Sequence, residues 1–223
     1  MPTTRAFPAR DPGAALRAAR AFYRAHGMKE WITALPRQAR PKVPRTTGLD
    51  AAFLFPPVPV QVATVTLLFE TLGTRPVRRI ADGDQYREPW VSDLHSLRMS
   101  MPRRRPVGPY LLIFRSRGLP PETVGVAPDI LTDRFREAGH TGLTIPEYLV
   151  LQRLALEAWG DHRFDAPDTR AGPQAQWLLD AGAPGEHVAA QWRPTAQRLE
   201  LRFVSPAAAD AAYGAHPTVV VPL

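Results

Sequence analysis

The chain of 223 residues contains no cysteine, and this absence removes several chemistries at once. Disulfide bonds, thiolate nucleophiles and zinc or iron sites with cysteine ligands are all excluded. Long apolar runs are also missing, since no window approaches the roughly 20 apolar residues of a membrane-spanning helix. Residues 1–16 hold prolines and charges where a signal peptide has an apolar run. We therefore expect a soluble cytoplasmic protein without membrane contact.

Lysine is nearly absent, because Lys29 and Lys42 are the two lysines among 28 Lys and Arg residues. These oppose 21 Asp and Glu residues, so the formal net charge is +7 and most positive groups are guanidinium groups. Arginine forms bidentate contacts with phosphate or carboxylate better than lysine does. A chain rich in arginine, alanine and proline is also typical of a GC-rich genome, whatever its function. The distribution of the charge is therefore more informative than its total.

The clearest local pattern predicts a helix over residues 143–159, LTIPEYLVLQRLALEAW. Thr144 can cap the first turn while Glu147, three residues later, reaches back to close a capping box. Apolar residues cover a wide face of this segment, which is typical of a helix docked on a core. Gly160 is expected to end the helix.

Three more helical segments, one of them a short turn, and one extended segment are expected by the same reasoning. Residues 12–26 predict a first helix, and a short second turn is expected through Trp31 and Leu35. Pro128 opens a further helix, of which Ile130, Leu131 and Phe135 are expected to face inward. Residues 36–48, PRQARPKVPRTTG, are interpreted as an extended connection and a solvated tether, with a phosphate-contacting arm as the alternative.

Strands are expected on both sides of the two later helices. Alternating apolar residues predict a bulged strand or two short strands over residues 58–62 and 65–69. The turn signal Asp82-Gly83 predicts a hairpin between residues 76–80 and 85–91. The most apolar strand candidate, residues 109–115, is expected to lie centrally in a sheet. Four further strands are predicted in the C-terminal third of the chain, over residues 175–179, 187–192, 198–203 and, as an edge strand, 218–221.

This order of elements does not have the regular alternation of a doubly wound sheet. It predicts an α+β fold with a mainly antiparallel sheet, two central helices and an N-terminal helical arm. We divide the chain into an N-terminal helix with a basic, proline-rich linker over residues 1–48 and an α+β domain over residues 49–223.

From Gly108 onward the chain resembles a bacterial family that is known as a domain of unknown function, DUF5701. The shared features are GPYLL at residues 108–112, VAPDIL at 126–131 and GHTGLTIPEYLVL at 139–151. A strand with Trp177, the GAP of residues 182–184 and Trp192 follow in the same order. The resemblance covers about half of the chain. It implies a shared fold and carries no activity with it.

Two clusters of positive charge suggest that the chain binds a polyanion. Residues 94–121 contain no acidic residue, and loop-like MPRRRP lies within them. The linker likewise has no acidic residue between Trp31 and Leu49. Guanidinium groups in such segments can contact a phosphate backbone, although they can also be solvated or paired with carboxylates from elsewhere. The candidate polyanion-binding residues are Arg98, Arg103, Arg104 and Arg105 together with Arg37, Arg40, Lys42 and Arg45.

Candidate catalytic and metal sites are weaker. Ser92, Asp93 and His95 have the residue types of a hydrolase triad, but groups so close in sequence cannot align as a triad does. Asp161, His162, Asp165 and Asp168 could ligate a metal or line an active site, although their spacing matches no standard motif. The five tryptophans are interpreted as core or interface residues.

The leading hypothesis from the sequence is a non-enzymatic binding or accessory protein without cofactor or metal. Its arginine-rich surface would contact a polyanion, in particular nucleic acid. The alternatives are an enzyme of unrecognised type with a site near Asp161, His162 and Asp165, or a protein-interaction module with a protein partner that uses exposed tryptophan or the proline-rich linker.

Overall fold

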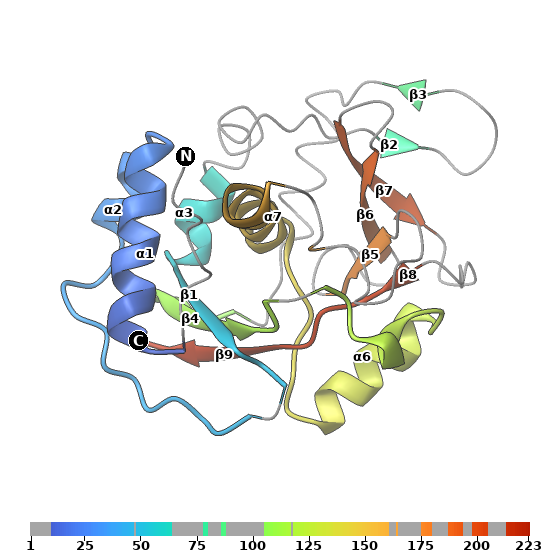
Figure 1. The fold of residues 1–223 in the computed structure, drawn as a ribbon, viewed down its shortest axis with the longest axis horizontal. Coiled ribbons are helices and arrows are strands. Elements are labelled where there is room, and N and C mark those ends of the chain that lie inside the picture. Colours follow the sequence, from blue (N-terminus) through green and yellow to red (C-terminus); the bar gives the residue numbers. More distant parts are fainter. Residues whose placement is uncertain are drawn as a thin grey trace.

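A computed structural model of the chain describes residues 10–46, 48–63, 78–79, 86–87, 105–116, 118–160, 164, 175–179, 187–193, 198–204 and 213–223. These residues form an α+β fold in which helices pack on mainly antiparallel sheets, as predicted (Figure 1). Three sheets are present among them, with three, two and four strands.

The N-terminal segment forms helix α1, Pro12–Ala25, as predicted. The side chain of Asp11 caps the helix by accepting a hydrogen bond from the Ala14 N–H, and the chain turns away at Gly27. The buried face of α1 carries Phe22 and Tyr23, whose rings contact Phe53 of the following strand edge to face. Helix α2, Lys29–Thr33, then adds the buried ring of Trp31. Because α1 and α2 share one core cluster with the strands that follow, the N-terminal helix packs on the body of the protein. The division into residues 1–48 and 49–223 stays a prediction.

The three-stranded sheet consists of β1 (Ala51–Phe55), β4 (Tyr110–Phe114) and β9 (Thr218–Pro222), all antiparallel. The strand order is β1-β4-β9, so β4 is central and β9 is an edge strand, both as predicted. Every residue of β1 and β4 is buried. A strand that is covered on both faces needs apolar residues at successive positions, which explains the uninterrupted runs AAFLF and YLLIF.

The strand predicted over residues 58–62 is wrong, because these residues belong to helix α3, Val58–Ala63. Pro59 lies in the first turn of this helix, where proline is tolerated because the N–H group it lacks would have no partner within the helix. The carbonyl oxygen of Pro57, just before the helix, accepts hydrogen bonds from the N–H groups of Val60 and Gln61. The strand lies just before it, in β1, where continuous burial leaves no alternation to detect. Residues 65–69, the second part of that prediction, lie outside the described residues.

The predicted strands are divided among separate sheets rather than joined in one, and strand β8 (Tyr213–Gly214) was not predicted. Strands β2 (Arg78–Arg79) and β3 (Tyr86–Arg87) pair antiparallel, which confirms the predicted pairing of these two segments. The four-stranded sheet contains β5 (Ala175–Leu178), β6 (His187–Arg193), β7 (Arg198–Val204) and β8 (Tyr213–Gly214). Its order is β7-β6-β5-β8, and β5 and β8 form the one parallel pair among the described strands.

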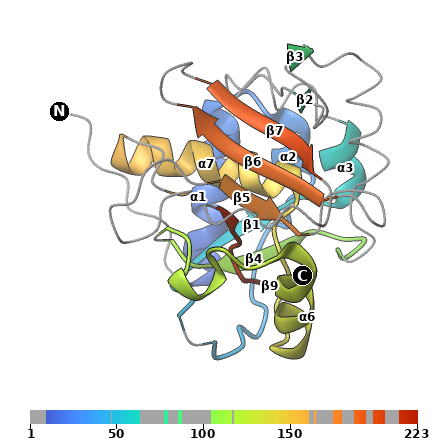
Figure 2. The same ribbon diagram turned by 90° about the vertical axis from the view of Figure 1, so that its right-hand side faces the viewer.

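Helix α7, Ile145–Trp159, is the predicted central helix and lies between the three-stranded and the four-stranded sheet (Figures 1 and 2). Both hydrogen bonds of the predicted capping box between Thr144 and Glu147 are present. Gly160 ends the helix with a φ of 74°, a conformation that costs other residues more than glycine. The short 3-10 helix η1, Pro121–Thr123, precedes helix α6 along the chain.

Helix α6, Pro128–Glu137, packs on the other face of the four-stranded sheet. Leu131 and Phe135 are buried there with Trp177 and Tyr213, as part of a second and smaller core cluster. Ile130, which was expected to face inward, is instead 50% exposed. Leu131 and Phe135 are four residues apart and therefore lie on the same face of this ten-residue helix. Ile130 lies to the side of that face.

Candidate functional site

The structure separates the predicted polyanion-binding residues into an exposed set and a buried residue. Arg37, Arg40, Lys42 and Arg45 are all exposed in the connection between α2 and β1. We call residues 36–46 the basic segment. It contains no helix or strand, as predicted, and no acidic residue.

The basic segment is held against α1. Arg20 donates a hydrogen bond from Nη2 to the Pro36 carbonyl oxygen at 2.8 Å, near the start of the segment. Arg10 donates from Nη1 to the Thr46 carbonyl oxygen at 3.0 Å and from Nη2 to the Pro44 carbonyl oxygen, near its end. These two arginines are ten residues apart, or about 15 Å along a helix. The segment therefore runs alongside the helix in the opposite direction (Figure 1).

Apolar side chains in the basic segment and just before it also hold the segment against the core of the protein. Leu35 and Ala39 are buried members of the main core cluster, and Val43 packs against that cluster. The anchoring positions recur every fourth residue, and the charged residues between them point to solvent. The charged side chains of this segment are solvated, as expected, but the segment is not a free tether, because its backbone carbonyls and its apolar side chains are attached to the protein.

Arg105 was predicted to contact a polyanion, and the structure contradicts this prediction. Its side chain is 0% exposed and forms an ion pair with the equally buried carboxylate of Glu147. A guanidinium group that is already paired away from solvent cannot also meet a phosphate. The other predicted arginines of this region, Arg98, Arg103 and Arg104, lie outside the described residues.

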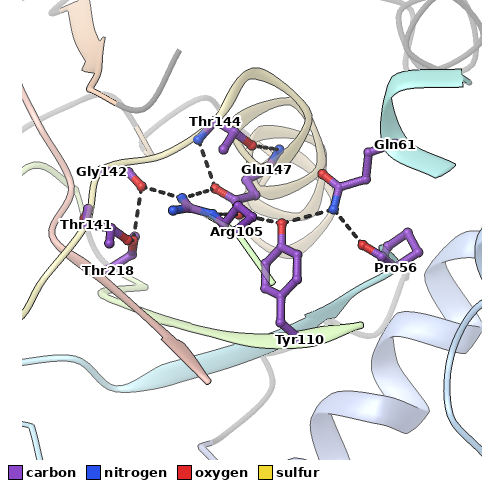
Figure 3. A network of polar contacts seen from close by, with 9 residues as sticks. All are labelled: Pro56, Gln61, Arg105, Tyr110, Thr141, Gly142, Thr144, Glu147 and Thr218. Carbon is purple, nitrogen blue, oxygen red and sulfur yellow. Dashed lines mark hydrogen bonds and ion pairs between the residues drawn. The ribbon is translucent and has the colours of Figure 1, made fainter. Parts of the chain in front are cut away.

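The Arg105–Glu147 pair is the centre of a buried polar network (Figure 3). Arg105 donates from Nε to Oε1 of Glu147 at 2.7 Å and from Nη2 to Oε2 at 2.8 Å, a bidentate geometry. Nη2 also donates to the Gly142 carbonyl oxygen at 2.7 Å. Glu147 Oε2 accepts a further hydrogen bond from the Thr144 N–H at 2.8 Å. The glutamate of the capping box thus serves both the helix terminus and a residue 42 positions before it.

Tyr110 extends the network toward helix α3. Its hydroxyl donates to Glu147 Oε1 at 2.6 Å and accepts a hydrogen bond from Gln61 Nε2 at 3.0 Å. Gln61 Nε2 also donates to the Pro56 carbonyl oxygen at 2.6 Å. The network therefore connects three separate parts of the chain, namely α3 with Pro56, the segment from Arg105 to Tyr110 at the start of β4, and the first turn of α7 with the residues just before it (Figure 3).

The charges of this network shift the pKa values of its members in opposite directions. Burial raises the pKa of the Glu147 carboxyl. The Arg105 charge and the hydrogen bonds from Arg105, Tyr110 and Thr144 together lower it by more, so the pKa lies below its usual range. Burial first, and then the negative charge of Glu147, raises the pKa of Tyr110 well above 10. Glu147 is therefore ionised and Tyr110 protonated at neutral pH.

The contacts of this network indicate a structural role. Glu147 is fully buried, and its two carboxylate oxygens already accept four hydrogen bonds, so no lone pair is left pointing at a substrate. Sequence reasoning identified Glu147 and Arg105 separately, one as a cap and the other as a surface charge. No local signal in the sequence connects them, because the contact bridges segments that are distant along the chain.

The alternative active site falls in a part of the chain that the structure does not describe. Asp161, His162, Asp165 and Asp168 lie outside the described residues, as do Ser92, Asp93 and His95. Among the residues that the structure does describe, no three His, Asp or Glu side chains come together in a way that could hold a metal ion. None of the described helices has both the length and the apolar character needed to cross a membrane. The enzymatic alternative stays a prediction.

Two of the five tryptophans fit the interpretation as core residues. Trp31 and Trp177 are each 1% exposed, and Trp159 is half-buried. Trp31 lies 5.0 Å from Tyr23, and Trp177 lies 4.7 Å from Tyr213, both measured between ring centroids in edge-to-face geometry. Such contacts are typical of core packing.

Comparisons of the chain with known protein families, with curated proteins and with solved structures find no match. The resemblance to the DUF5701 family therefore stays a prediction.

Proposed function

We propose that the protein binds a polyanion, and nucleic acid in particular, through the basic segment, in a binding or accessory role. The observation that carries this proposal is the display of Arg37, Arg40, Lys42 and Arg45 on an exposed stretch whose backbone is anchored at both ends. Anchoring matters because side chains on an ordered backbone lose less conformational entropy on binding than those of a free tether.

The distribution of charge along the chain supports the same surface. The first 46 residues contain ten Arg and Lys residues against two acidic residues, Asp11 and Glu30. The remaining 177 residues contain 18 basic and 19 acidic residues and are nearly neutral overall. The excess positive charge of the protein is therefore concentrated in its N-terminal fifth. Arg17 and Arg24 are exposed on α1 and add to the charge of the helix on which the basic segment lies.

Arginine chemistry favours phosphate as the recognised group. The guanidinium group is planar and weakly hydrated, and it matches two phosphate oxygens at once. Four phosphate contacts to duplex DNA give a slope of about −3.6 in the logarithm of affinity against the logarithm of salt concentration. Affinity then falls about a hundredfold between 50 and 200 mM salt.

The test is fluorescence anisotropy with a labelled duplex DNA, a single-stranded DNA and an RNA of equal length, each measured over this range of salt. We expect Arg37→Ala, Arg40→Ala, Lys42→Ala and Arg45→Ala together to abolish salt-sensitive binding. The double variant Arg40→Ala/Lys42→Ala should weaken binding by about tenfold or more.

The matched control is Arg134→Ala/Arg136→Ala on α6, which removes the same number of exposed positive charges with the same spacing. We expect this control to change affinity less than twofold. An equal loss in both double variants would mean that net charge alone drives the binding. Undiminished binding by the quadruple variant would contradict the proposal.

The arginines before β4 belong to a second, separate experiment. Arg98, Arg103 and Arg104 remain proposed contacts, whereas Arg105 does not, because it is paired with Glu147. The variant Arg103→Ala/Arg104→Ala therefore leaves the buried network intact. A reduced salt slope in this variant would extend the binding surface beyond the basic segment, and an unchanged slope would confine it there.

A further inference from the structure

Two buried side chains near the connection between the sheets carry polar atoms that the fold does not satisfy. Gln176 on β5 is 0% exposed, and neither its Oε1 nor its Nε2 has a hydrogen-bond partner among the described residues. His216, between β8 and β9, is also 0% exposed, and its Nδ1 has no partner among them either. A buried amide without hydrogen bonds is costly enough to require an explanation.

The hydrogen-bonding roles of these atoms follow from the geometry. The Nε2 atom of His216 lies 2.9 Å from the Phe164 carbonyl oxygen, and a carbonyl can only accept. Nε2 therefore carries the hydrogen, and Nδ1 of the neutral ring is an acceptor. Burial, the largest cause, lowers the pKa of His216 to about 4, and the nearby Arg115 charge also lowers it, whereas the hydrogen bond to Phe164 opposes this shift. The ring is accordingly neutral over the physiological range.

Strand register places the two side chains on the same side of the four-stranded sheet. Gln176 pairs with Gly214 on β8, two residues before His216. Tyr213 and Ala215 belong to the smaller cluster under α6. His216 instead stacks on Phe164, a member of the main core cluster, with ring centroids 4.2 Å apart.

The strand neighbours of Gln176 leave its amide without competing side chains. Its two cross-strand partners are Ala190 on β6 and Gly214 on β8, the smallest side chains available. Neither offers a hydrogen-bonding side chain. The amide therefore needs a partner that comes from outside these strands.

We propose that Gln176 and His216 hold an internal water molecule between them, at the point where the chain passes from the four-stranded sheet to the three-stranded sheet. The water donates one O–H to Nδ1 of His216 and hydrogen-bonds to the amide of Gln176. Globular proteins contain about one buried water for every 27 residues, each with about three hydrogen bonds to otherwise unsatisfied groups. The two partners are the kind of groups that such water satisfies.

The site connects two parts of the fold. β8 contributes two residues to the four-stranded sheet, and β9 pairs with β4 in the other sheet (Figures 1 and 2). His216 lies in the short stretch between them. A water bound to both His216 and Gln176 therefore holds this stretch of chain against β5, beyond the two paired residues of β8.

A double-mutant cycle tests whether the two residues share one site. Gln176→Leu and His216→Phe each remove one partner of the water and leave the other polar group unsatisfied, whereas the double variant leaves neither. We expect the unfolding equilibrium constant of the double variant, from urea titration, to be about fivefold or more below the value for independent effects. Independent effects would overturn the proposal.

The matched control is Gln61→Leu combined with His216→Phe. Gln61 is also a buried glutamine, but its amide bonds to Pro56 and Tyr110 in the other network. Its effect should be independent of the His216 change.

A high-resolution crystal structure of the unmodified protein gives a direct test that depends on no variant. We expect an ordered water about 2.7–3.2 Å from both His216 Nδ1 and the Gln176 amide. A dry contact, or a protein group bonded to the amide, would overturn the proposal.

Discussion

The guanidinium group of Arg105 and the carboxylate of Glu147 form a bidentate ion pair, and both side chains are fully buried. Two charges removed from water gain little net stability over a well-packed apolar pair. A single unpaired charge in the same place costs far more, because nothing then offsets its desolvation. The pair therefore holds the chain to one arrangement, in which the segment that precedes β4 and the first turn of α7 must meet.

Replacement of Glu147 by glutamine should destabilise the protein by about 3–5 kcal/mol. The variant keeps an acceptor for the Thr144 N–H or the Tyr110 hydroxyl but leaves the Arg105 charge without a counterion. Urea unfolding followed by tryptophan fluorescence measures the loss. The double variant Arg105→Met/Glu147→Leu removes both charges and should be more stable than either single variant. A cost below about 1 kcal/mol for Glu147→Gln would show that Arg105 is solvated.

The helix around this pair could be predicted from the sequence, whereas the pair itself could not. Thr144, Glu147 and Gly160 act on backbone groups within one turn of themselves, so a local pattern is sufficient to recognise them. The partner of Glu147 lies 42 residues away and depends on how β4 packs beside α7. Arginine also looks the same in a sequence whether it is solvated or buried.

The strand error at residues 58–62 has a related cause. Alternation over five residues is a weak signal, and Val58, Val60 and Val62 satisfy it without being in a strand. Gln61 contributes to the outcome through long-range contacts, since its side chain bonds to Tyr110 on β4. Tertiary contacts of this kind override the preference of β-branched residues for strands.

The packing of the basic segment also depends on long-range contacts, which a local sequence pattern does not reveal. The sequence identified which residues are charged, and the structure confirms that four of them are exposed. That Leu35, Ala39 and Val43 anchor the segment depends on the core cluster beneath it. No turn or cap signal in the segment reveals this packing.

His216 should make the stability of the protein depend on pH between about 6.5 and 4. The folded pKa is about 4, whereas the ordinary value of a histidine is 6.5. As the pH falls through this window, the unfolded chain binds a proton that the folded chain does not bind, so stability decreases with acid. A shift of this size corresponds to about 3 kcal/mol in total.

The variant His216→Phe keeps the stacking with Phe164 but cannot be protonated, so its stability should fall less between pH 6.5 and 4. Urea unfolding at several pH values measures the difference from the unmodified protein. Burial also lowers the pKa of His140, but both proteins contain this residue. Its contribution to the pH dependence of stability is therefore the same in both and cancels in the comparison. Parallel pH profiles for the two proteins would contradict the prediction.

Arg20 should protect the basic segment from proteolysis, since its hydrogen bond to the Pro36 carbonyl oxygen holds the start of the segment on α1. Hydrogen bonds to charged groups contribute about 1.5–3 kcal/mol, and cleavage by trypsin follows the population of the opened state. In the variant Arg20→Ala we expect cleavage after Arg37 and Lys42 to be about tenfold faster or more. Mass spectrometry of the fragments over time identifies these sites.

Arg17→Ala is the matched control for this experiment. Arg17 is an exposed arginine on the same helix, so its replacement changes the net charge and removes a trypsin site in the same way. It should leave cleavage of the basic segment unchanged. If both variants are cleaved at the rate of the unmodified protein, the apolar anchors at Leu35, Ala39 and Val43 hold the segment without help from Arg20. The polyanion would then meet a surface whose order depends on packing rather than on the arginine contacts to the backbone.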